Sequence, residues 1–268
     1  MKTLIVLCEG AHDHAFLTRL LAIAGYGTYE DTPTQLPHPI RDVICRELSG
    51  LDLSDNRLDQ IRVRAPGVLI HDEIYVVIYE LGGNRNIQRA RELVSKYKEG
   101  FSQPLVSPAP PGSGLGFLVV TDADESTPGD KAAEVRRDYS EVFAEHDGFE
   151  HRRVFGEGAY PVGLYIVSKD MERGRLDDVI VDMIRDGHPS LLEQVEVFIS
   201  THEGAYCPRD RPQDRGKMKI GIAGQLEKPG STNSVIIRHS KLVSPDALRE
   251  HRIYDEMIGL ISDIVRDM

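Results

Sequence analysis

Carboxylates gather at two points of the sequence where an apolar run gives way to polar residues. Glu9 ends the first such run, and Asp13 follows four residues later. Asp122 and Asp124 end another, separated by a single residue. Like charges brought together in this way repel one another, and proteins tolerate such clusters where a divalent cation neutralises them. Because every ligand atom would be an oxygen, the pattern favours Mg²⁺ or Mn²⁺ over Zn²⁺.

Each of these acidic residues also has an ordinary explanation. Asp13 alone would suit the first turn of a helix, where the helix dipole favours negative charge. Two aspartates separated by one residue arise by chance in acidic chains, and they also mark haloacid-dehalogenase-type phosphatases and sugar-nucleotide transferases. The combination is more informative. An acidic strand end, a nearby helix acid and a second acidic strand end occur in the order that a metal-dependent phosphoryl-transfer site needs.

Four short apolar runs predict the strands that would position these acids. The runs lack polar alternation, which is typical of parallel strands buried on both faces. They are Leu4–Cys8, Ile74–Tyr79, Phe117–Val120 and Val162–Val167. Segments with helical spacing of apolar residues follow the first three runs. The sequence therefore predicts an α/β fold with a parallel sheet of about four strands flanked by helices, and ligands bind such sheets at the carboxyl ends of the strands.

The same patterns divide the chain into a core and an extension. We expect the α/β core to span residues 1–175, with an insertion at about 26–72 where prolines interrupt the pattern and a helix is possible near 42–48. Beyond Gly174 apolar residues recur at three and four positions, which indicates helices. Residues 176–268 are therefore predicted to form a helical C-terminal extension packed on the core.

Charge and composition exclude several classes of protein. The 268 residues include 32 Lys and Arg against 43 Asp and Glu, a net charge of −11, which argues against coating DNA or an anionic membrane by bulk charge. No apolar run approaches the roughly 18 residues of a membrane span, and the apolar start is too short for a signal peptide, so we expect a cytoplasmic chain. Cys8, Cys45 and Cys207 have no spacing that supports disulfides or zinc.

One segment has a positive net charge, although the chain as a whole is acidic. Residues 206–244 contain eight basic and three acidic residues, a net charge of +5. A basic segment near an acidic metal cluster is what binding and cleavage of a phosphate backbone would use. The alternative is a solvated loop with ordinary scatter of charge.

The segments around the two acidic strand ends resemble two motifs of the Toprim family. Residues 4–17 form an apolar run that ends in Glu-Gly, with Asp13 shortly after and an apolar helix behind it, as in the first motif. Residues 119–124 are similar to the second motif, Asp-x-Asp. The family includes topoisomerases, bacterial primases, RecR-type recombination proteins, ribosomal-RNA maturation nucleases and OLD-family nucleases. The resemblance covers about residues 2–180 and implies a Toprim-like, that is Rossmann-like, sheet.

Further segments resemble the small stand-alone and OLD-family nuclease-like branch. Residues 80–87 are similar to a Gly-Gly-Lys-x-Asn segment after the second strand. Residues 174–178 are similar to a Gly-x-Leu-Glu-Asp segment, whose Glu is an extra metal ligand in those nucleases. Here Asp177 stands at that position and is one methylene shorter. A basic residue follows later in those nucleases, and both Lys217 and Lys219 are candidates for it.

The resemblance implies a Mg²⁺-dependent nuclease or related phosphodiester-transfer enzyme acting on DNA or RNA, with Mn²⁺ as a possible substitute. Glu9 would hold a cation or act as general acid and base, and Lys217 or Lys219 would stabilise developing negative charge. The metal ligands that it implies are Glu9, Asp13, Asp122, Asp124 and Asp177.

Two other functions stay open. One is a non-catalytic adaptor that binds metal, nucleotide or nucleic acid for a partner. Because the chain has no GxxxxGK[ST] motif, ATP dependence of the OLD type would need a separate ATPase partner. The other is a small-molecule phosphatase with Asp122 as nucleophile, which would leave Glu9 and Asp13 without a task. His12 and His14 flank Asp13 but lack the spacing of a zinc site, so we interpret them as surface residues or as residues that orient a ligand.

Overall fold

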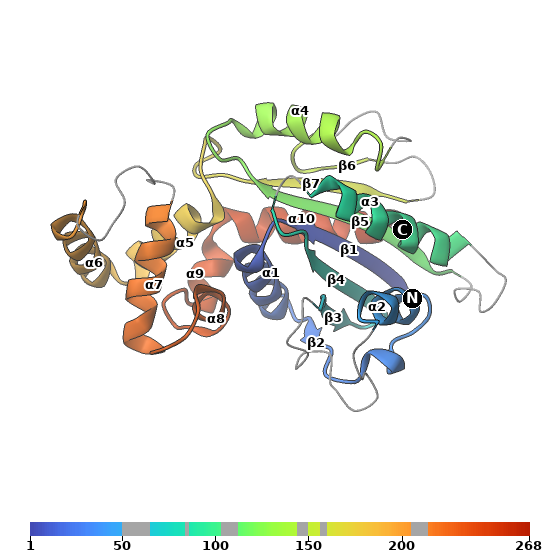
Figure 1. The fold of residues 1–268 in the computed structure, drawn as a ribbon, viewed down its shortest axis with the longest axis horizontal. Helices are drawn as coiled ribbons and strands as arrows, with labels where there is room; N and C mark the ends of the chain where they lie inside the picture. The colour runs from blue at the N-terminus through green and yellow to red at the C-terminus, as the bar shows by residue number, and fades with distance from the viewer. Residues whose placement is uncertain (50–64, 84–85, 103–111, 144–149, 156–159, 205–213) are drawn as a thin grey trace.

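The fold is built on one mixed β-sheet, seen in a computed structural model that describes residues 1–49, 65–83, 86–102, 112–143, 150–155, 160–204 and 214–268. Within these residues the sheet has seven strands in the order β2-β3-β4-β1-β5-β7-β6 (Figure 1). The strands are β1 (Lys2–Cys8), β2 (Gly27–Thr28), β3 (Gly67–His71), β4 (Ile74–Glu80), β5 (Gly114–Asp122), β6 (Arg153–Phe155) and β7 (Val162–Val167).

The four central strands confirm the predicted parallel sheet. β1 pairs in parallel with β4 and with β5, and β5 pairs in parallel with β7. The three further strands are antiparallel additions at the edges, β2 and β3 on one side and β6 on the other. β2 and β6 are only two and three residues long, too short to leave a periodic signal in the sequence.

Helices cover both faces of the sheet, as the sequence predicts. They are α1 (Ala11–Ile23), α2 (Ile40–Glu47), α3 (Ile87–Ser102), α4 (Pro128–Tyr139), α5 (Leu176–Gly187), α6 (Pro189–Thr201), α7 (Arg215–Glu227), α8 (Asn233–His239), α9 (Pro245–Glu250) and α10 (Arg252–Asp267), with a short 3-10 helix at Pro33–Gln35. Among the described residues, no helix has the length and apolar character needed to span a membrane.

Two hydrophobic layers meet at the sheet. Along β1, Leu4, Val6 and Cys8 pack in the layer that includes α1, α5 and α10, whereas Ile5 and Leu7 pack in the layer that includes α2, α3 and α4. Successive side chains of a strand point to opposite faces, so both sets must be apolar when both faces are covered. This explains why the strand shows no polar alternation in the sequence.

The last helix, α10, lies directly against β5 and β7. Three strand glycines make the approach possible, because a Cβ at Gly114, Gly116 or Gly163 would come within 2.6–2.7 Å of Met268 or Ile264. Glycine in a strand often marks such a close approach. The end of the chain therefore forms part of one layer around the sheet.

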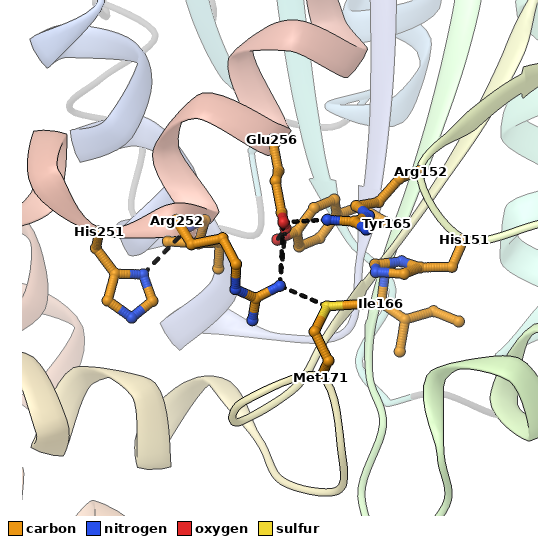
Figure 2. A network of polar contacts seen from close by, with 9 residues as sticks. His151, Arg152, Tyr165, Ile166, Met171, His251, Arg252 and Glu256 are labelled. Carbon is orange, nitrogen blue, oxygen red and sulfur yellow. Dashed lines mark hydrogen bonds and ion pairs between the residues drawn. The ribbon is translucent and has the colours of Figure 1, made fainter.

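A polar network joins α10 to β7 and to the loop that follows it (Figure 2). The carboxylate of Glu256 accepts hydrogen bonds from the Tyr165 hydroxyl at 2.8 Å and from Arg252 at 3.1 Å, and it forms an ion pair with Arg152. Arg252 also contacts the sulfur of Met171, which lies between β7 and α5. The network thus fixes the start of the loop that leads to α5.

Helices α6, α7 and α8 stand in a row at one end of the molecule, and α8 packs against α1 (Figure 1). Arg19 of α1 donates to the carbonyl oxygens of Ile237 at 2.7 Å and of Ser240 at 2.8 Å, which joins α1 to the end of α8. The described part of the predicted basic segment, residues 214–244, contains the helices α7 and α8 and the loops that follow them. Cys207, Arg209 and Arg211 lie outside the described residues.

Candidate active site at the carboxyl ends of the central strands

A cleft of about 460 Å³ opens where β1, β4 and β5 end. Its lining combines the turn after β1, the start of α1, the end of β4 and the turn after it, the end of β5, the start of α5 and one residue of α7. The ionisable side chains that line it are Glu9, His12, Asp13, Glu80, Asp122, Asp177 and Lys217. Four of the five acids that were predicted as metal ligands therefore line one cleft, and Asp124 does not.

Backbone hydrogen bonds hold the turn that carries Glu9. The amides of Gly82 and Gly83 both donate to the carbonyl oxygen of Glu9 at 3.0 Å. These glycines have φ angles of 84° and 120°, a left-handed conformation that favours glycine. The described part of the predicted Gly-Gly segment thus shapes the floor of the cleft, whereas Asn84 and Arg85 lie outside the described residues.

Asp13 is held at the start of α1, inside the cleft. Its Oδ2 accepts a hydrogen bond from the Gly10 amide at 2.9 Å, and the residue is 7% exposed. Burial and the nearby negative charge of Glu9 raise the pKa of Asp13 to about 7. The sequence expectation that Asp13 and Glu9 share a site agrees with this placement.

Asp122 is in a similar position at the end of β5. Its Oδ1 accepts a hydrogen bond from the Leu176 amide at 2.9 Å. Burial and the charges of Asp13 and Glu9 raise the pKa of Asp122 well above its ordinary value. Among the described residues, neither Lys nor Arg forms an ion pair with Glu9, Asp13 or Asp122.

Asp124 lies outside the cleft because the strand ends before it. Its φ angle is 56°, in the left-handed region, and its backbone forms a two-way bridge with Gly174 at 2.8 and 3.0 Å. Its carboxylate accepts a hydrogen bond from Arg175 Nε at 2.7 Å and lies 3.7 Å from the ammonium of Lys131. The resemblance implies that Asp122 and Asp124 are both metal ligands. Residues two positions apart on a strand point the same way, but strand geometry does not continue through Asp124.

Asp177 lines the cleft but already has a partner. Its Oδ1 lies 2.8 Å from Nδ1 of His12, and Asp177 is 5% exposed. A Cβ at Gly216 of α7 would lie 2.9 Å from that of Asp177, so α7 packs closely behind this pair. The sequence does not predict the contact of His12 with Asp177, because 165 positions separate the two residues. The position of His12 next to Asp13 is the signal in the sequence that places it near the cleft.

The structure separates the two candidate lysines. Lys217 lines the cleft. Lys219, two residues further along α7, donates to Glu196 of α6 at 2.6 Å and lines a different cavity. Two positions along a helix turn the side chain to nearly the opposite side, which explains the separation.

The donor set of the cleft suits a hard divalent cation. Among the described residues, no group of three or more His, Cys, Asp or Glu side chains is already arranged to hold a metal ion. However, the carboxylates of Glu9, Asp13 and Asp122 share the cleft without cationic partners among the described residues, and burial together with their mutual repulsion raises the pKa values of Asp13 and Asp122. Oxygen ligands and unrelieved negative charge fit Mg²⁺ or Mn²⁺.

Comparison with known proteins gives structural likenesses alone, since the chain matches no family model and no curated protein. A hypothetical protein from Pyrococcus horikoshii OT3 is similar, with 16% sequence identity and a TM-score of 0.49, over 98% of this chain and 95% of that one. The C-terminal region of the OLD protein of Xanthomonas campestris pv. campestris is also similar, with 14% identity and a TM-score of 0.38, over 98% of this chain and 95% of that one.

Proposed function

We propose that this chain is a divalent-metal-dependent phosphodiester hydrolase that cleaves DNA or RNA. The observation that carries the proposal is the group of Glu9, Asp13 and Asp122, which face one open cleft without a cationic partner among the described residues. Buried like charges are costly, and their persistence in a cleft is typical of functional sites. The resemblance of residues 4–17 and 119–124 to the Toprim motifs supports the same function.

Glu9, Asp13 and Asp122 are the residues that would hold Mg²⁺ or Mn²⁺. A bound cation supplies polarisation of the phosphoryl oxygen and a water of lowered pKa. Two protein contacts orient these acids. The Thr121 hydroxyl donates to Glu9, and the Leu176 amide at the start of α5 donates to Asp122. The carboxylates are thus positioned before any ligand arrives, which is how preorganised sites limit the cost of reaction.

His12 and Lys217 complete the group of residues in the cleft that can act on a substrate. Asp177 holds Nδ1 of His12, which leaves Nε2 able to hold or move a proton. In this arrangement Asp177 positions the imidazole ring rather than the cation. The ammonium of Lys217 is suited to bind a phosphate oxygen as a compact charge.

A cleavage assay tests the proposal. The purified chain is incubated with single- and double-stranded DNA and RNA in Mg²⁺, Mn²⁺ or EDTA, alone and with candidate ATPase partners. We expect cleavage of at least one substrate with Mg²⁺ or Mn²⁺, none in EDTA, and none with Asp122→Ala. The matched control is Asp263→Ala. It removes an acid of α10 that pairs with Arg266 and does not line the cleft.

Two results would overturn the proposal. Inertness toward every nucleic acid with either cation, with and without partners, favours a non-catalytic adaptor. Hydrolysis of small phosphate esters with a phosphoaspartate trapped on Asp122, and no cleavage of nucleic acid, favours a phosphatase.

A further inference from the structure

A second cavity, of about 130 Å³, lies between α1, β3 and α8. His14 and Thr18 on α1, Thr28 and Tyr29 at the end of β2, and Arg238 on α8 line it, together with residues 65–69. None of these residues lines the acidic cleft. The cavity is therefore a separate feature of the molecule.

Buried polar atoms without partners point to a ligand here. Thr18 is 3% exposed, and its Oγ1 has no hydrogen-bond partner. The buried Nε2 of His14 also has none. These residues are one helical turn apart on the same face of α1. A buried polar atom without a partner costs free energy, so two of them beside one cavity indicate that an occupant supplies the missing hydrogen bonds.

The charge around α8 favours an anionic occupant. Arg238 lines the cavity, and a guanidinium has five N–H donors, so it can serve a ligand beside another partner. The nearest acid of the acidic cleft, Glu80, faces the other ring nitrogen of His14 at 2.9 Å.

The cavity is large enough to enclose a phosphate group but too small to enclose a whole nucleotide. A water molecule occupies roughly 10–15 Å³ on this kind of measure, so 130 Å³ holds more than a few waters. Gly67 brings β3 against His14, because a Cβ there would lie 2.2 Å from Nε2. The wall on this side is thus fixed, and a phosphate group fits the available space, while a larger substituent on it would lie outside the cavity.

We propose that this cavity binds a singly protonated phosphate-type oxyanion. The Thr18 hydroxyl and the Arg238 guanidinium donate to its oxygens, and its own P–OH group donates to His14 Nε2, because Nδ1 of that ring faces the Glu80 carboxylate. Inorganic phosphate and the terminal phosphate of a nucleotide share this chemistry. Because Nδ1 of His14 contacts Glu80, which lines the acidic cleft, the two sites are joined through one imidazole ring.

Titration calorimetry tests the proposal on the full chain in EDTA, with orthophosphate and adenosine 5′-monophosphate as probes. We expect saturable binding of at least one probe at one site. Thr18→Val should weaken it roughly 10-fold, the effect of one lost hydrogen bond to a charged group. The matched control is Thr3→Val, since Thr3 is also fully buried with an unpaired hydroxyl but lines neither this cavity nor the acidic cleft.

A second pair of variants tests whether the positive charge of Arg238 contributes to binding. Arg238→Gln should weaken binding by at least 10-fold, whereas Arg249→Gln, which changes an exposed arginine of α9, should leave it unchanged. Tighter binding of the nucleotide than of orthophosphate identifies a nucleotide phosphate as the ligand, and the reverse identifies the free ion.

Absence of binding by both probes would overturn the proposal, and so would equal binding by wild type, Thr18→Val and Arg238→Gln. The measurement needs neither metal nor cleavage. Asp122→Asn should bind the probes as wild type does, so failure of this proposal is distinguishable from failure of the proposed nuclease activity.

Discussion

The acidic residues near the sheet end fall into two groups with opposite surroundings. Asp13 and Asp122 are held by backbone amides and repel each other without a cationic side chain. The resemblance implies that Asp124 and Asp177 are metal ligands too, yet both have partners within the protein. Asp124 lies between Arg175 and Lys131, and Asp177 contacts His12. A carboxylate that has its partner in the protein is available to position other groups. One that lacks a partner is available for a ligand.

Asp124, one of the two acids with a partner in the protein, organises the loop between β7 and α5. Asp124 is bridged to Gly174 through two backbone hydrogen bonds and binds Arg175 through its side chain. The next amide, that of Leu176, donates to Asp122. Asp124 therefore holds in place the segment that orients Asp122, and the Glu256 network holds the other end of that segment through Met171.

The largest effect should come from an unpaired acid. Asp122→Asn keeps the oxygen that accepts from Leu176 but removes the charge, so Mn²⁺ affinity should fall roughly 100-fold, because ligand charge sets the affinity of such sites. Isothermal titration with Mn²⁺ measures it. An unchanged affinity would show that Asp122 does not bind the cation.

The corresponding change in the paired group should be smaller and of a different kind. Asp124→Asn should reduce the cleavage rate roughly 10-fold, because Arg175 and its loop lose an anchor, while Mn²⁺ affinity changes less than about 3-fold. Steady-state kinetics and the same titration separate the two quantities. A loss of Mn²⁺ affinity as large as that of Asp122→Asn would make Asp124 a ligand and remove the distinction between the groups.

The two lysines of α7 extend the comparison to the basic segment. Lys217→Gln should raise KM or lower kcat by several-fold up to about 10-fold, as expected for one charged contact. Lys219→Gln should change activity by less than about 2-fold, because Lys219 pairs with Glu196 and does not line the cleft. Equal losses from both changes would contradict the assignment of Lys217 alone to the cleft.

The smallest effect is on stability without metal. The pKa of Asp13 is raised from 3.8 to about 7, so the folded state binds its proton more tightly than the unfolded state does, and stability should fall as pH rises from about 4 to about 7. Asp122→Asn should relieve part of this cost, by about 0.5–2 kcal/mol near pH 8 and much less near pH 4.

Urea unfolding in EDTA across this pH range measures the effect. Asp263→Asn, at a half-exposed acid paired with Arg266, is the control and should show no such growth with pH. Parallel profiles for wild type and Asp122→Asn would show that repulsion in the cleft is unimportant.

The sequence predicts the central fold well because burial on both faces leaves an unbroken apolar run. All four parallel strands and the helices α1, α3, α4, α5, α6 and α10 follow from such runs and from helical spacing. The edge strands β2 and β6 are too short for either signal. Helix α7 is not predicted, because its apolar residues alternate with lysines and glycines and show no helical spacing. Packing against neighbouring helices rather than its own pattern stabilises it.

The candidate site is predictable where a residue follows a strand directly, and less so where the chain turns. Glu9 and Asp122 stand at strand ends, whose position the apolar runs determine. Asp124 departs from the expectation because a left-handed residue changes the direction of its side chain, and no spacing in the sequence reports that. The contact of His12 with Asp177 depends on how α1 and α5 meet, which only the folded structure shows.

The most direct test of the account is a crystal structure of the chain in Mn²⁺, with the ion located by its anomalous scattering. We predict an ion in the cleft at roughly 2.1 Å from carboxylate oxygens of Glu9, Asp13 and Asp122, with Asp124 still bonded to Arg175. An ion bonded to Asp124 with Arg175 displaced, or a cleft without any anomalous peak at saturating Mn²⁺, would contradict it.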